Sequence, residues 1–114
     1  MSLKAAIMNP WIVIVIAGIF EVGFTTFLKL SDGFTNWKYV ILFVISAAFS
    51  FGLLSYAMKS IPLGSAYAIW TGIGAAGTAI IGMIYFKDPV SFGRIAFLIL
   101  LVGSIVGLKF VSAK

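Results

Sequence analysis

The chain of 114 residues is 62% hydrophobic and 10% charged, whereas an average soluble domain is roughly 45–50% apolar and about 25% charged. A single domain of this size cannot bury so much apolar surface, which excludes an ordinary water-soluble globule. The eight basic residues exceed the three acidic ones, for a net charge of +5, but they are scattered singly. They therefore indicate the flanks of membrane segments and not a stripe that binds nucleic acid.

Histidine and cysteine are both absent, and the acidic residues are limited to Glu21, Asp32 and Asp88. Disulfides, thiolate chemistry, histidine-dependent catalysis and hydrolysis by paired carboxylates all lack the residues that they require. We therefore expect no enzyme activity, no metal site and no cofactor.

Four apolar segments, residues 10–29, 37–58, 63–86 and 92–110, are separated by short polar stretches. Each has about 20 residues, which at 1.5 Å per residue matches a hydrocarbon layer of about 30 Å. The strands of membrane barrels are shorter, about 10 residues with alternating polarity. The sequence thus predicts an all-α integral membrane protein whose residues 1–114 form a single domain of four transmembrane helices. The first segment is too long for the apolar core of a cleaved signal peptide.

The basic residues are distributed evenly between the two predicted faces of the membrane. The face with both termini and the second loop carries Lys4, Lys59, Lys109 and Lys114, and the opposite face carries Lys29, Lys38, Lys87 and Arg94. Since an excess of Lys and Arg normally sets the orientation of a membrane protein, a count of four against four predicts insertion in both orientations. The alternative is an orientation bias that the charge count does not reveal.

Glu21 lies in the middle of the first apolar segment, and the next basic residue is Lys29. A carboxylate near the bilayer centre costs at least about 2.5–3.5 kcal/mol on insertion scales, so it should face a partner helix or a watery cavity. There it can hold either a proton or an organic cation. The alternative is a protonated structural acid that only links two helices.

The helical neighbours of Glu21, three and four residues away, are Ala17, Gly18, Phe24 and Thr25. Small residues on one side and an aromatic ring with a hydroxyl on the other predict room for a ligand beside the carboxylate. Ala17 and Gly18 are equally typical of close helix packing, and that alternative stays open.

In the third segment, Tyr67 and Trp70 lie on the same helical face as Gly74. Aromatic rings attract cations in a desolvated site, although an aromatic stripe alone is more often packing. One buried acid and no buried base favour a cation site. In the fourth segment, Gly103 and Gly107 have a GxxxG spacing that suits helix association and predicts a dimer contact.

A single chain of four helices is too thin to enclose a cavity and shield a carboxyl group. Two copies inserted in opposite orientations would place two Glu21 side chains at one site near the midplane, as inverted repeats do in larger transporters. We therefore expect an antiparallel dimer.

The sequence resembles the small multidrug resistance family over nearly its whole length. The most specific features are a glutamate in the first helix, Glu21-Val22, and the run from Ala66 to Gly74, which reads Ala-Tyr-Ala-Ile-Trp-Thr-Gly-Ile-Gly. The other matching pieces are Asn9-Pro10-Trp11, Lys29 to Thr35 and Gly107-Leu108-Lys109.

This resemblance implies an antiparallel dimer in a bacterial-type inner (plasma) membrane that exchanges protons for small organic cations. It makes Glu21 the shared carboxylate for proton and substrate, and Tyr67 and Trp70 wall residues of the site. It also implies a kink of the third helix at Gly72 and Gly74. No nucleic acid is expected as a partner.

Two branches of the family share features with the chain. The run from Trp70 to Gly74 and the polar residue Ser50 resemble the guanidinium exporters. The chain departs from that branch at Phe24, where guanidinium exporters usually have Trp. Thr25 and Thr26 resemble the drug exporters.

The sequence-based hypothesis is a proton-coupled antiporter that exports quaternary ammonium or other lipophilic cations. The alternatives are a guanidinium exporter, or a membrane subunit without transport of its own. The segment from Ser50 to Ala57 is similar to members that work as heterodimers, so a paired heterodimer is the alternative to a homodimer.

Overall fold

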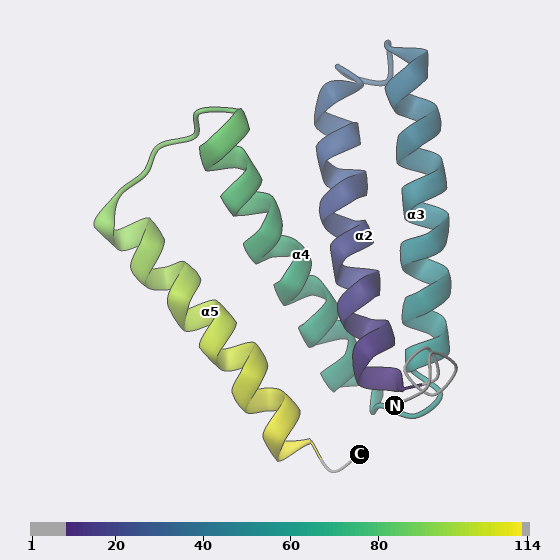
Figure 1. Cartoon of the computed structure of the whole chain (residues 1–114), viewed down its shortest axis with the longest axis vertical. Coiled ribbons are helices and arrows are strands. Elements are labelled where there is room, and N and C mark those ends of the chain that lie inside the picture. Colours follow the sequence, from purple (N-terminus) through teal and green to yellow (C-terminus); the bar gives the residue numbers. More distant parts are fainter. Residues whose placement is uncertain (1–8, 113–114) are drawn as a thin grey trace.

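The computed structural model of the chain describes residues 9–112. They form four α-helices, labelled as in Figure 1: α2 (Pro10–Leu30), α3 (Trp37–Ala57), α4 (Leu63–Tyr85) and α5 (Phe92–Val111). All four are long and apolar enough to cross a membrane, and residues 9–112 contain no strand. The prediction of an all-α membrane protein with four spans is therefore confirmed. The helix boundaries lie within one residue of the predicted segments.

Local sequence explains where α2 and α5 begin. The Asn9 side chain accepts a hydrogen bond of 2.9 Å from the backbone N–H of Trp11, and Pro10 occupies the first turn of α2, where its missing N–H is not needed. The Ser91 side chain caps α5 in the same way, by accepting a bond of 3.1 Å from the N–H of Arg94. Polar residues that interrupt the apolar segments thus satisfy backbone groups at the membrane boundary.

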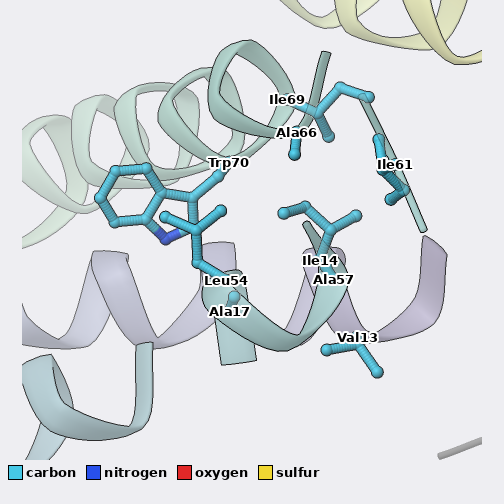
Figure 2. Close-up of a cluster of buried hydrophobic side chains, with 9 residues drawn as sticks. All are labelled: Val13, Ile14, Ala17, Leu54, Ala57, Ile61, Ala66, Ile69 and Trp70. Atoms are coloured by element: carbon cyan, nitrogen blue, oxygen red, sulfur yellow. The ribbon is translucent and has the colours of Figure 1, made fainter. Parts of the chain in front are cut away.

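Helix α2 is the centre of the bundle, because it packs against both α3 and α4 (Figure 1). Ile14 and Ala17 of α2 are fully buried, and they meet Leu54 and Ala57 of α3 (Figure 2). The rest of the cluster comes from Val13 of α2, the α3–α4 connection and the first half of α4, the last two contributing Ile61, Ala66, Ile69 and Trp70. Small residues allow α2 and α4 to approach closely: a Cβ atom at Gly18 would lie 2.6 Å from the Ile73 side chain.

Helix α5 differs from the other three because none of its residues is buried. It packs along α4 and diverges from α2 and α3 (Figure 1). Ile105 and Leu108 pack against the core, but many of its large apolar side chains face outward, including Phe97, 72% exposed, and Phe110, 76% exposed. In a membrane these side chains meet lipid or a second protein chain.

The beginning of α2 and the end of α5 lie at one end of the bundle, together with the α3–α4 connection (Figure 1). Lys59 and Lys109 are at this end, and the connections α2–α3 and α4–α5 are at the other. Lys4 and Lys114, which the charge count also uses, lie outside the described residues. Insertion in both orientations remains a prediction.

Candidate functional site

The carboxyl group of Glu21 lies in the middle of α2 and faces α4. It is in direct contact with Gly74: a Cβ atom at position 74 would overlap the Glu21 side chain. The Oε1 atom of Glu21 is buried and has no hydrogen-bond partner among residues 9–112. An ionised carboxylate in this position therefore has unused acceptor capacity, which a ligand with N–H groups or a proton would satisfy.

A hydrogen-bonded chain joins α2, α3 and α4 one helical turn before Glu21. The indole Nε1 of Trp70 donates to the Ser50 hydroxyl oxygen over 2.9 Å, and Ser50 donates its own hydrogen to the backbone carbonyl of Ala17 over 2.7 Å. Ala17 is one helical turn before Glu21, and Ser50 is fully buried. The chain therefore fixes the position of the Trp70 ring and leaves the Ser50 oxygen one further lone pair.

Aromatic rings from all three helices form a continuous row at this level. Phe24 of α2 stacks on Phe51 of α3 with ring centroids 5.7 Å apart, and Phe51 lies 5.4 Å from the ring of Trp70. Tyr67 continues the row at 5.7 Å from Trp70. Phe51 and Tyr67 are 52% and 55% exposed, so the row opens onto the outer surface of the chain. The single chain does not enclose this site.

The structure thus brings several predicted site residues together. Glu21 meets Gly74, Ser50 meets Trp70, and Phe24 is connected to Trp70 and Tyr67 through Phe51. A role for these residues in binding a cation or a proton remains a prediction.

Other predicted residues lie in different surroundings. Gly18 contacts Ile73 of α4, which is helix packing and not open space beside the carboxylate. Gly72 faces Ile105 of α5, where a Cβ atom would lie 2.6 Å from the Ile105 side chain. Helix α4 is continuous from Leu63 to Tyr85, and a functional kink at Gly72 and Gly74 remains a prediction.

Thr25 pairs with a residue that the sequence analysis did not single out. Its hydroxyl lies 2.7 Å from that of Thr78, and it also donates to the backbone carbonyl of Val22 over 3.0 Å. Since Thr25 has only one hydroxyl hydrogen, Thr78 is the donor when this second bond is present. The pair joins α2 to α4 one turn beyond Glu21.

Two further features of the site were missed from sequence. Phe51 connects Phe24 to Trp70, and the Thr71 hydroxyl is buried without a hydrogen-bond partner among residues 9–112. Thr71 lies within the Ala66–Gly74 run, and Phe51 follows Ser50 directly. Their closeness in sequence to predicted site residues is the feature that could have identified them.

The predicted dimer contact on α5 lies on an open surface. A Cβ atom at Gly103 or Gly107 would meet no other atom within 4 Å. These glycines are therefore accessible to another helix, and their contact with a second chain remains a prediction.

Four apolar membrane-spanning helices, with a carboxyl group between two of them, define the chain as a multi-pass membrane protein with a polar site inside its helix bundle. Residues 9–101 match the family model described as Small Multidrug Resistance protein. The chain belongs to the small multidrug resistance family, a family of transporters. It is accordingly a multi-pass protein of the bacterial inner membrane.

Curated relatives carry more specific names. The chain is 48% identical to a guanidinium exporter of Yersinia pseudotuberculosis over 102 residues, which cover 90% of this chain and 98% of the relative. It is 45% identical to a guanidinium exporter of Proteus vulgaris over the same shares of the two chains. It is also 42% identical to a protein of Bacillus subtilis described as a probable guanidinium efflux system subunit, covering 92% of this chain and all of the relative.

Proposed function

We propose that the chain exports guanidinium-type cations in exchange for protons, and that Glu21 binds both. The observation that carries this proposal is the buried Oε1 of Glu21, which lacks a hydrogen-bond partner among residues 9–112. A guanidinium cation is planar and presents several N–H donors that match a carboxylate in a bidentate pair. A quaternary ammonium ion has no N–H group and would leave this buried acceptor unpaired.

Ser50 supports the same substrate class. Its hydroxyl accepts from Trp70 and donates to Ala17, which leaves one lone pair that an N–H group could use. Ser50 is fully buried in the single chain, so a guanidinium cation reaches this lone pair only if the surrounding side chains move. The names of the relatives from Yersinia and Proteus agree with this substrate class. Guanidinium therefore replaces quaternary ammonium, the main sequence-based hypothesis, as the preferred substrate.

Proton coupling follows from using one carboxyl group for both ligands. When Glu21 is ionised it can bind the cation, and when it is protonated its negative charge is lost. The two ligands therefore exclude each other, and cation export is driven by protons that move in the opposite direction.

The exposed edges of Phe51 and Tyr67 support a site that two chains complete together. An antiparallel homodimer is the arrangement that the balanced charges favour. The Bacillus relative is named as a subunit, which keeps the paired heterodimer as the alternative.

The aromatic row favours a second candidate, the export of quaternary ammonium ions. Rings of Trp, Tyr and Phe attract such ions in desolvated sites, and four of them form a continuous row of which Trp70 is hydrogen-bonded to Ser50. Phe24 and Phe51 add apolar surface that suits lipophilic substituents.

The deciding experiment uses the purified chain in proteoliposomes that contain a pH-sensitive dye. We expect an inward gradient of guanidinium to drive proton efflux, and an equal gradient of tetramethylammonium to drive much less. Faster flux with tetramethylammonium would select the second candidate. Flux with neither cation would indicate a non-transporting subunit or the need for a second chain.

A further inference from the structure

An apolar groove of about 450 Å³ runs between α2, α4 and α5, away from the aromatic row. Its walls include Ile14 and Val15 of α2, Ile69 and Ile73 of α4, and Val106 of α5. It lies where α5 diverges from α2 (Figure 1). Because the surrounding medium is the hydrocarbon of the bilayer, this groove is open to lipid chains and not to water.

One end of the groove carries a positive charge. Lys109 lines the groove, and its Nζ atom lies 5.2 Å from the ring centroid of Trp11 at the start of α2. A hydrogen bond of 2.8 Å between Ser65 and Ser112 joins the first turn of α4 to the end of α5, which holds Lys109 at this level. Trp and Lys in this combination are typical of the boundary between hydrocarbon and headgroups.

No carboxylate is available to neutralise Lys109 at this end of the described chain. Among residues 9–112, Glu21 lies in mid-helix, and Asp32 and Asp88 lie in the two connections at the opposite end. Lys59 is at the same end as Lys109, so the local charge is positive. An anionic group at the headgroup level is therefore the complementary ligand.

We propose that this groove holds one acyl chain of an anionic phospholipid whose phosphate is bound by Lys109. The dimensions favour an acyl chain over a protein helix, because a helix about 10 Å wide would fill the same volume within roughly one turn of about 5.4 Å. The apolar walls of the groove bind the acyl chain, and Lys109 selects the anionic headgroup. This site is separate from Glu21 and does not depend on the transported cation.

Tryptophan quenching by brominated phospholipids tests the proposal on the full-length chain in bilayers. The parent protein for this experiment carries Trp37→Phe, because Trp37 is 74% exposed and would also be quenched. Trp11 and Trp70 then remain, and since Trp70 is buried, Trp11 is the principal lipid-facing reporter. Dibrominated phosphatidylglycerol and phosphatidylcholine with identical acyl chains are titrated into unbrominated phosphatidylcholine. Because one Lys near the surface favours anionic lipid, we expect half-maximal quenching at an about five-fold lower fraction of phosphatidylglycerol.

Lys109→Gln should abolish this preference. The matched control is Lys59→Gln, which removes the same charge from the same end of the bundle but does not line the groove. We expect the control to retain the preference. Equal quenching by both lipids in the parent, or an equal loss in both variants, would overturn the proposal in favour of non-specific lipid contact.

A second pair of variants tests the acyl-chain groove itself. Val106→Phe fills the groove and should reduce the quenching of Trp11 by both brominated lipids. Ile99→Phe, on an exposed part of α5 outside this groove, should not. Equal quenching of Trp11 in the two variants would contradict an acyl chain in the groove. Cross-linking of a cysteine at position 106 to a second protein chain would show that protein covers the groove. Either result would make the proposal wrong.

Discussion

The carboxyl group of Glu21 packs directly against the backbone of Gly74, with no space for a Cβ atom between them. The absence of a side chain at position 74 is what allows the carboxyl group to lie between α2 and α4. This relationship connects a residue that is conspicuous in the sequence to one whose importance depends on the packing of two helices.

We therefore expect Gly74→Ala to displace the carboxyl group or separate the two helices. Overpacking of this kind typically costs about 1–3 kcal/mol, and guanidinium affinity should fall by roughly tenfold or more. Isothermal titration in detergent measures the change. Gly52→Ala is the control, because a Cβ atom at Gly52 on α3 meets nothing within 4 Å. Equal affinities of the two variants would show that the contact does not position Glu21.

Glu21→Gln should abolish guanidinium-driven proton flux, because the amide carries no charge and does not exchange a proton in this pH range. The variant should still insert and purify like the parent, since neutralising a buried acid removes a cost of insertion. Asp32→Asn, which alters an acid in the α2–α3 connection, should retain flux. Substantial coupled flux in the Glu21 variant would remove the central claim.

Apparent guanidinium affinity should depend on pH if one carboxyl group serves both ligands. Above the pKa of Glu21 the carboxylate is free to bind the cation, and affinity should reach a plateau. Below that pKa, protons occupy the site, and affinity should weaken by about tenfold for each pH unit. Binding measured across acidic and alkaline pH tests this, and a flat profile would identify Glu21 as structural.

Ser50→Ala should remove the acceptor for the Trp70 indole N–H and leave a buried donor unpaired, at a cost of about 1–3 kcal/mol. We expect weaker guanidinium binding and a smaller effect on tetramethylammonium, which makes no hydrogen bond to Ser50. The control is Ser46→Ala, another buried serine of α3, which faces Gly23. If both cations lose affinity equally, Ser50 acts only by supporting the fold.

The balanced charge count predicts that one lysine decides how the chain inserts. Removing Lys59 should favour the orientation with the α2–α3 and α4–α5 connections in the cytoplasm, and adding a lysine beside Ser60 should favour the reverse. Reporters fused to the C-terminus, one active only in the cytoplasm and one active only on the opposite side, measure the fraction of each orientation.

An antiparallel homodimer requires both orientations at once. Either lysine variant alone should therefore transport poorly, and co-expression of the two should restore flux. A wild-type chain that is found in one orientation only would contradict insertion in both, and its activity would then require a second, oppositely oriented protein.

The sequence alone was sufficient for the four spans and for Glu21 as the intramembrane acid. Both depend on quantities that are local in the chain: the length of an apolar segment, and the cost of a charge within it. The polar residues at the helix ends, Asn9 and Ser91, are equally local, because a cap bonds the backbone two or three residues away.

The contacts around Glu21 were decided only by the tertiary structure. These helices are apolar on all sides, so hydrophobic periodicity does not show which face meets a neighbouring helix. The rotation and approach of α2, α3 and α4 pair Thr25 with Thr78, place Gly18 against Ile73, and insert Phe51 between Phe24 and Trp70. Each of these contacts joins residues far apart in the chain, and each depends on packing between helices, which residue spacing within one helix does not determine.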